Sequence, residues 1–331
     1  MQRLFSIFEP FVLSLLGTVL LATILPARGA FAIYAGYMAD AGIVLLFFLH
    51  GAKLSRDAIW QGLRNWPLHL AVLGATFILF PLLGLALSHM PGVDPSLATG
   101  ILFLTLLPST VQSSIAFTAI ARGNVAAAIC SASFSNLLGI VLTPALVALL
   151  MKVEGGGGVS LASIEGILLQ LLAPFVIGHL LRPWIGGFVA RRKSLLTIVD
   201  RGSILLVVYT AFGAAVVEGL WSRVSPADLG KLALLCLLLL GVILTATFLL
   251  ARVMRLPRAD AIVLQFCGSK KSLASGVPMA GVLFPAAQVG IILLPVMLFH
   301  QIQLIACAML ARHYGEQADG EGEGARASEK A

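Results

Sequence analysis

The chain has 331 residues, of which 59% are hydrophobic and only 11% are charged. A soluble globular domain carries roughly 25% charged residues, so this composition excludes an ordinary soluble protein and is typical of a polytopic membrane protein. The net charge of +7 does not indicate nucleic-acid binding, because the basic residues lie scattered between long apolar runs. Four cysteines without metal-type spacing make a zinc site or a disulfide framework unexpected.

Ten apolar runs are long enough to cross the membrane as helices, each of which needs about 20 residues. We expect spans at about 9–26, 34–52, 67–88, 97–121, 124–151, 161–184, 199–219, 228–251, 260–284 and 287–311. Four consecutive glycines predict a flexible linker over 155–160. The polar, Gly-rich end predicts a disordered cytoplasmic tail over 313–331.

The basic residues predict the orientation of the spans. If both termini are cytoplasmic, most of the 22 Lys and Arg residues fall in segments on the cytoplasmic side. The positive-inside rule predicts this bias. We therefore expect a multi-pass protein of the inner (plasma) membrane with both termini in the cytoplasm. The sequence gives no indication of the oligomeric state.

Two sequential halves of five spans each, 1–154 and 161–312, must have opposite orientations in the membrane, which predicts an inverted repeat. PFVLSLLG at 10–17 resembles PFVIGHLL at 174–181. In each half the fourth span is interrupted, by LLPSTVQSSIAFT at 106–118 and by QFCGSKKSLASGVP at 265–278. Interrupted spans at corresponding positions indicate a transporter's binding site near the membrane midplane.

Hydroxyl and amide side chains in the two interruptions are candidates for binding an ion or a solute. They are Ser109, Thr110, Gln112, Ser113 and Ser114 in the first, and Ser269, Ser272 and Ser275 in the second. An alternative stays open: these side chains satisfy backbone groups freed by the kinks, or allow close helix packing.

Five stretches resemble the bile acid:sodium symporter superfamily, and within it the branch of solute carrier family 10 member 7 and its bacterial relatives. They are LLFFLHGAKLS (45–55), LPSTVQSSIAFT (107–118), GNVAAAICSASFSNLLG (123–139), FCGSKKSLASGVPMA (266–280) and LPVMLFHQIQL (294–304). The resemblance covers about residues 5–312. It implies an all-α fold of ten helices in a 5+5 inverted repeat. Spans 1, 2, 6 and 7 would form a panel, and the other six a core in which broken spans 4 and 9 cross.

The resemblance also implies two sodium ions behind this crossing, as in members that transport bile acids. The family's Ser-Asn pair in span 4 matches Ser113 and Ser114. Its hydroxyl ligands in span 5 fall near Cys130, Ser131 and Ser133.

The ninth span departs from the family pattern. Aligned through Ser272, the chain has Gln265 in place of the family's Glu, Ser269 in place of its Gln, and Lys270 in place of the next Asn. The third predicted span lacks the Gln that the family places there. At these positions the chain has lost an acid and gained a base.

Lys270 and Lys271 have three interpretations. One or both could extend to an aqueous vestibule without a further role. A lysine ammonium, here Lys270, could replace the bound cation, held by Gln265, Ser113 and Ser114, so that loss of its proton substitutes for the release of sodium. A lysine could instead bind an anionic substrate directly, helped by the positive ends of half-helices. The sequence does not decide which lysine faces the ion and which the substrate.

Three further polar residues are secondary candidates. His300 and Gln303 lie one helical turn apart in the tenth span, where a hydrogen bond between helices is the default and a site the alternative. Asp40 lies toward the outer end of the second span and is a candidate gate residue.

The expected function is secondary active transport of a small organic anion by alternating access, coupled to Na⁺ as in the family. Proton coupling, or an uncoupled variant with Lys270 in place of the cation, is the first alternative. A non-transporting regulatory membrane protein is the second. The sequence contains no paired carboxylates within the spans, no HExxH and no Walker loop, so neither an enzyme nor a bound cofactor is expected.

Overall fold

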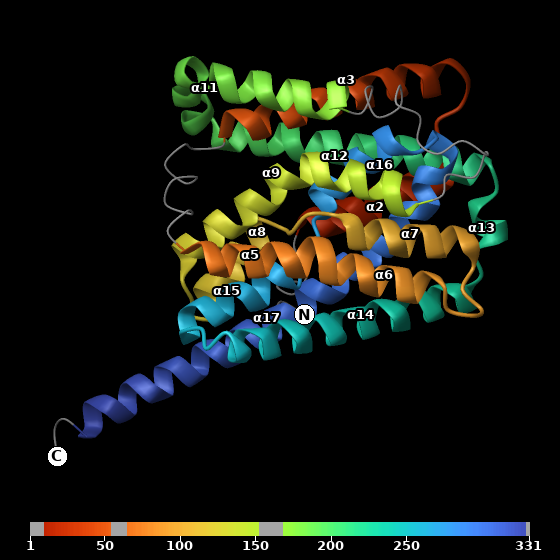
Figure 1. The fold of residues 1–331 in the computed structure, drawn as a ribbon. Helices are drawn as coiled ribbons and strands as arrows, with labels where there is room; N and C mark the ends of the chain where they lie inside the picture. Colours follow the sequence, from red (N-terminus) through yellow and green to blue (C-terminus); the bar gives the residue numbers. More distant parts are fainter. Residues whose placement is uncertain (1–9, 54–64, 152–167, 329–331) are drawn as a thin grey trace.

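The structure is a computed structural model that describes residues 10–53, 65–151 and 168–328. Within these ranges every regular element is a helix (Figure 1). The first half contains α2 (Pro10–Ile24), α3 (Gly29–Lys53), α5 (Trp66–Gly74), the π-helical η2 (Ala75–Leu79), α6 (Phe80–Ser88), α7 (Pro95–Leu106), α8 (Gln112–Ile120) and α9 (Val125–Leu150). The second contains η3 (Leu168–Leu172), α11 (Ala173–Arg191), α12 (Lys193–Val217), α13 (Leu220–Arg223), α14 (Pro226–Val253), α15 (Arg258–Gly268), α16 (Leu273–Leu283) and α17 (Ala286–Ser328).

Seven helices in the described ranges are long and apolar enough to cross a membrane, which confirms an all-helical polytopic membrane protein. They span Gly29–Lys53, Trp66–Ser88, Val125–Leu150, Gln170–Val189, Ser194–Val217, Pro226–Val253 and Ala286–Ala318. Two shorter apolar helices lie at Leu13–Ile24 and Pro95–Leu106. The predicted spans at 97–121 and 260–284 are each divided into two helices, so the total of ten stays a prediction. The predicted linker at 155–160 lies outside the described residues.

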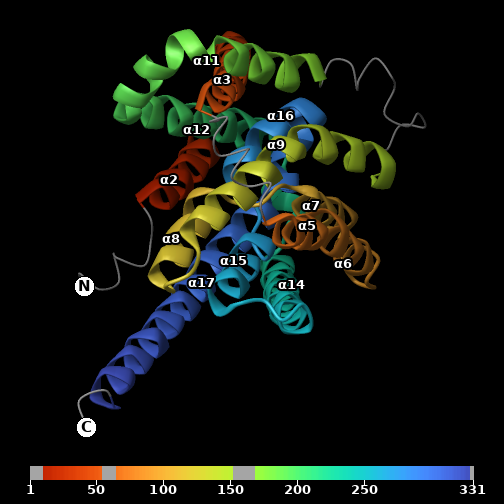
Figure 2. The same cartoon turned by 60° about the vertical axis from the view of Figure 1, so that its left-hand side comes forward.

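Four helices, α2, α3, α11 and α12, gather at one side of the molecule (Figure 2). We call them the panel group. Helix α3 packs along α11 and α12, and α2 packs on α12. A Cβ at Gly51 would lie 2.0 Å from the Phe175 carbonyl oxygen, and one at Gly178 would lie 2.0 Å from that of Phe48. These reciprocal glycines let the backbones of α3 and α11 come into direct contact.

The other long helices form the core group, which comprises α5 to α9 and α14 to α17. Helix α7 packs on α6 and α17, α14 packs on α15 and α17, and α15 contacts α5, α8 and α9. The panel group meets the core group mainly where α12 lies against α16 and α17. One large cluster of buried apolar side chains runs through both groups, from Phe47 in α3 to Phe103 in α7, Phe212 in α12 and Phe299 in α17.

Helix α17 continues to Ser328 and projects beyond the other helices (Figure 1). The sequence predicts a disordered tail from residue 313, whereas the backbone there is helical. Glu, Gln, Ala and Arg in this segment are good helix formers, and α17 enters it already formed and meets no further proline. The disordered cytoplasmic tail over 313–331 stays a prediction.

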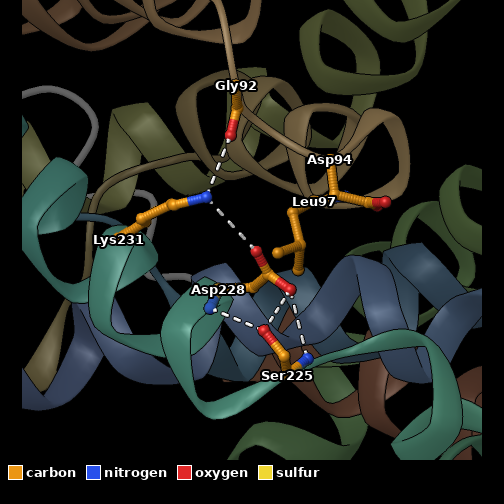
Figure 3. Close-up of polar contacts among 6 residues, drawn as sticks. All are labelled: Gly92, Asp94, Leu97, Ser225, Asp228 and Lys231. Carbon is orange, nitrogen blue, oxygen red and sulfur yellow. Dashed lines mark hydrogen bonds and ion pairs between the residues drawn. The ribbon is translucent and has the colours of Figure 1, made fainter.

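The start of α14 is fixed by a capping box (Figure 3). The Asp228 N–H donates to Ser225 Oγ at 3.2 Å, and the Ser225 N–H donates to the Asp228 carboxylate at 3.1 Å. Lys231 lies between the Asp228 carboxylate, at 3.7 Å, and the Gly92 carbonyl oxygen, at 3.5 Å. These contacts tie the start of α14 to the turn that precedes α7.

Candidate functional site

Two helix breaks, where continuous chain leaves the helical conformation, lie side by side in the core group. One separates α7 from α8 and the other separates α15 from α16. Pro108 has no N–H to donate to the preceding turn, so α7 ends before it. The Ser272 N–H donates to the Pro108 carbonyl oxygen at 2.9 Å, and Thr110 Oγ1 donates to the Lys271 carbonyl oxygen at 2.8 Å. The two interrupted segments therefore cross in direct contact.

Two serines of the first break satisfy carbonyl groups at the end of α15. Ser109 Oγ donates to the Cys267 carbonyl oxygen at 2.6 Å, and Ser114 Oγ donates to that of Phe266 at 3.1 Å. The last carbonyls of a helix have no partner within the helix, so they need such donors. Asn136 Nδ2 donates in turn to the Ser109 carbonyl oxygen at 3.0 Å. Ser109 and Ser114 therefore satisfy backbone groups freed by the helix breaks, which is the alternative to ion or solute binding.

The Lys271 side chain enters a cage of backbone carbonyl oxygens. Its Nζ donates to Thr76 O at 2.8 Å, Thr105 O at 2.7 Å and Leu107 O at 2.6 Å. Its peptide is held by the Gln303 amide, which accepts from Lys271 N and donates to Lys271 O, both at 2.9 Å. Every donor of this ammonium group therefore has an acceptor.

The Lys270 side chain lies in an apolar environment instead. Its Nζ is buried and has no hydrogen-bond partner among the described residues. The nitrogen lies 4.0 Å from the ring centroid of Phe117 and 5.1 Å from that of Phe266. Both lysines are fully buried, at 0% and 1% exposure. The two neighbouring ammonium groups therefore occupy separate and different surroundings.

A cavity of about 380 Å³ lies between the panel group and the crossing. Helices α3 and α12 form one wall, and the starts of α8 and α16, with α9 and α17, form the other. Seven of the predicted candidate residues line it: Thr110, Gln112, Ser113, Ser133, Ser272, Ser275 and His300. Ser113 Oγ is buried and has no hydrogen-bond partner among the described residues. The cavity wall therefore contains a hydroxyl group without a hydrogen-bond partner among the described residues.

Charged residues of the panel group line one end of the cavity. Lys53 of α3 forms an ion pair with Asp200 of α12. The Arg201 guanidinium carbon lies 5.2 Å from the Phe11 ring centroid. His50 Nδ1 is hydrogen-bonded to the carbonyl oxygen of the preceding helical turn. Two basic side chains, Lys53 and Arg201, and one acid, Asp200, give this end of the cavity an excess of basic groups.

Several predicted site residues lie away from this cavity. Ser131 is buried and hydrogen-bonded to His69 Nδ1 at 2.7 Å. Ser269 Oγ donates to the Gln265 carbonyl oxygen at 2.5 Å, and Gln265 Nε2 donates to Leu244 O at 2.9 Å. Gln303 Nε2 is hydrogen-bonded to His300 Nδ1 at 2.9 Å, and Gln303 itself does not line the cavity. Asp40 is exposed on α3, and neither lysine of the pair is among the lining residues.

The sequence prediction missed several polar residues that line the cavity. Asn136 accepts from Ser275 Oγ at 2.7 Å and so joins α9 to α16. An Asn after a run of serines within an apolar span was a signal that could have identified it. Asp200 and Arg201 resemble any charged span end in the sequence, so nothing distinguished them. Among the described residues, no group of three or more His, Cys, Asp or Glu side chains could hold a metal ion.

An all-helical membrane protein with two broken, crossing helices beside a polar cavity has the architecture of a secondary transporter. The sequence profile of the SBF-like CPA transporter family matches residues 9–316. The chain belongs to this family and is a membrane transporter of the bile acid:sodium symporter type.

Relatives extend over most of the chain. An uncharacterized protein of Pseudomonas aeruginosa is 56% identical over 313 residues, which cover 94% of each chain. YfeH of Escherichia coli (strain K12), named as a candidate symporter, is 52% identical over 320 residues, or 96% of each chain. Sodium/bile acid cotransporter 7 of Rattus norvegicus is 28% identical over 280 residues, which cover 81% of this chain and 80% of that protein.

Proposed function

We propose that the protein is a secondary active transporter of a small organic anion that works by alternating access. The observation that carries this proposal is the cavity between the panel group and the crossing. It combines the starts of two half-helices with a cationic end and apolar walls. Such a cavity is complementary to a molecule that has both an anionic group and a hydrocarbon body.

The two half-helices support an anionic substrate. Gln112 and Ser113 form the start of α8, and Ser272 and Leu273 form that of α16, and all four line the cavity. The N–H groups of a first helical turn carry partial positive charge and attract anions. The start of α8 has no side-chain cap. Its N–H groups are therefore available to a ligand together with the Ser113 hydroxyl.

The remaining lining supports an organic substrate. Leu46 and Phe47 of α3, Phe175 of α11 and Ile204 of α12 present apolar surface on the panel side. Met279 of α16 lines the opposite side, and methionine adapts to irregular apolar shapes. We infer that the hydrocarbon part of the substrate packs between these side chains while its charged group lies at the crossing.

The transport mechanism in this proposal is a movement of the panel group against the core group. We propose ten spans arranged as two inverted halves, 1–154 and 161–312, with the α7/α8 break matching the α15/α16 break. The excess of basic residues supports cytoplasmic termini in the plasma membrane. In that orientation the Lys53 and Asp200 end of the cavity opens to the cytoplasm.

The coupling ion is expected to be Na⁺, because relatives are named as a candidate symporter and as a sodium/bile acid cotransporter. The alternative is a proton-coupled or uncoupled transporter in which a lysine replaces the cation. The sequence indicates Lys270 as the lysine that replaces the cation, and this role stays a prediction.

The proposal is tested by uptake of a set of labelled organic anions into proteoliposomes, with and without a sodium gradient. We expect saturable uptake of at least one anion. Ser113→Ala should raise its KM about 10- to 100-fold, since a hydrogen bond to a charged group contributes about 1.5–3 kcal/mol. Thr245→Ala removes an exposed hydroxyl on α14 and should leave KM unchanged. Specific binding without uptake would contradict transport and favour a regulatory membrane protein.

A further inference from the structure

The carbonyl cage around Lys271 is formed by two separate parts of the core group, η2 and the end of α7. Thr76 belongs to η2, Thr105 lies in the last turn of α7, and Leu107 follows directly. The three acceptors are backbone oxygens at 2.6–2.8 Å from Nζ. Among the described residues the ammonium has no carboxylate partner, and the Phe80 ring centroid lies 4.2 Å away.

Local backbone structure explains why these oxygens are free to accept. The π-helical turn of η2 shifts the hydrogen-bond register within an otherwise α-helical segment, and such turns often occur at functional sites. Thr105 and Leu107 lie at the end of a helix, where carbonyls lack partners within the helix. Pro108, which follows, has no N–H to donate to the Thr105 carbonyl oxygen. The cage therefore exists because of backbone geometry and does not depend on any side-chain acceptor.

Free carbonyls at the C-terminal end of a half-helix are the groups that coordinate monovalent cations in membrane proteins. The negative end of the α7 dipole adds to their attraction for a cation. In this chain the cation is covalently attached, and it uses its three N–H donors on three oxygens. A soluble ion would have to displace a group that cannot diffuse away.

We infer that the Lys271 ammonium is a tethered cation that fills a monovalent-cation site at the crossing. It excludes soluble ions from the cage and holds η2 to the end of α7. Removal of the side chain should expose a site for a small monovalent cation or an alkylammonium ion. The inference concerns the coupling step, so its functional meaning rests on the proposed transport. The stability experiment that tests it does not depend on transport.

The chain supplies a matched control in the neighbouring residue. Lys270 is equally buried, has the same side chain and lies in the same break, but its nitrogen contacts aromatic rings and no carbonyl cage. Truncation of either lysine removes the same atoms. Only truncation of Lys271 leaves carbonyl oxygens that need a cation.

The experiment measures thermal unfolding of the purified full-length chain in choline chloride, with sodium, potassium or butylammonium added at constant ionic strength. Each variant is compared with the wild type in the same salt, because a sodium response of the wild type reports the separate coupling-ion site of the proposed function. Lys271→Ala should melt several degrees lower, and one or more of the ions should restore its Tm saturably. Lys270→Ala should show no such restoration. Lys271→Met, whose side chain fills the cage without charge, should be destabilised and not restored.

The outcomes separate this inference from the transport proposal, because stability is measured without a substrate. If Lys271→Ala does not fold in choline, the readout becomes the yield of folded protein purified in each salt. Failure of every ion to restore Lys271→Ala, in Tm or in yield, overturns the inference. Equal restoration of Lys270→Ala also overturns it.

Discussion

Lys270 and Lys271 are neighbours in the chain, but their charges have opposite energetic consequences. The Lys271 ammonium donates to three oxygens, whereas the Lys270 ammonium is buried without an acceptor among the described residues. A buried cation without hydrogen bonds loses its hydration, and the faces of Phe117 and Phe266 offset only part of this cost. Burial alone therefore does not show which lysine stabilises the fold.

Lys270→Met tests this difference. The substitution keeps most of the side-chain volume and removes the unsatisfied charge, which should raise the free energy of unfolding by about 1–3 kcal/mol. Thermal unfolding in detergent at neutral pH measures the effect. A clear loss of stability in Lys270→Met would contradict it and would indicate an acceptor for this ammonium in the folded protein.

The surroundings of the two lysines could not be derived from the sequence. The motif placed both residues in an interrupted span, and this was correct because glycines and serines weaken a helix there. Their directions depend on the non-helical backbone between α15 and α16. The acceptor Thr76 lies 195 residues from Lys271 in the sequence, and no local pattern connects them.

At the scale of helices, apolar runs predicted long elements well. The run at 67–88 corresponds to helical residues 66–88, and the run at 124–151 corresponds to α9 at Val125–Leu150. Pro108 correctly indicated the end of α7. The π-helical turn η2 was not predicted, although Pro81, just after it, lacks an N–H and disturbs the α-helical hydrogen bonds there. Its register depends on the helices packed around it.

The contact between α3 and α11 predicts a strong effect of added volume. Gly178→Ala would place a methyl group 2.0 Å from the Phe48 carbonyl oxygen, so the two helices must separate. We expect a loss of about 1–3 kcal/mol or more, because tightly packed interfaces do not accept extra atoms. Thermal unfolding in detergent measures the loss.

Gly187→Ala is the matched control for Gly178→Ala, because it lies in the same helix and its added methyl group meets nothing within 4 Å. It should be neutral or slightly stabilising, since Ala has the higher helix propensity. Equal effects of the two substitutions would show that backbone propensity, and not the close contact with α3, determines the cost.

At the scale of the molecule, the panel and core groups are apart at one end of α12 and in contact at the other. Asp200 and Arg201 line the cavity near the start of this helix. About 22 Å further along α12, by the rise of a helix, Ala215 meets α17. There a Cβ at Gly290 would lie 2.6 Å from the Ala215 Cβ. Alternating access requires this closed end to open while the end at Asp200 closes.

A disulfide across the closed end should therefore stop transport. In Ala215→Cys/Gly290→Cys the two Cβ atoms are near the separation of about 3.5–4.5 Å that a disulfide needs, after a small outward shift. Oxidation would tie α12 of the panel group to α17 of the core group. We expect uptake into proteoliposomes to be lost on oxidation and to return on reduction, while substrate binding from the open end persists.

Gly42→Cys/Ser203→Cys provides the control, because a Cβ at Gly42 lies 3.2 Å from the Ser203 Cβ and both residues belong to the panel group. A disulfide between α3 and α12 joins helices that move together in the proposed mechanism, so oxidation should leave uptake unchanged. Mass spectrometry of both double variants establishes that the bonds have formed. Full uptake by the oxidised Ala215→Cys/Gly290→Cys protein would contradict a movement of the panel against the core. Loss of uptake in both oxidised proteins would place the essential movement within the panel group itself.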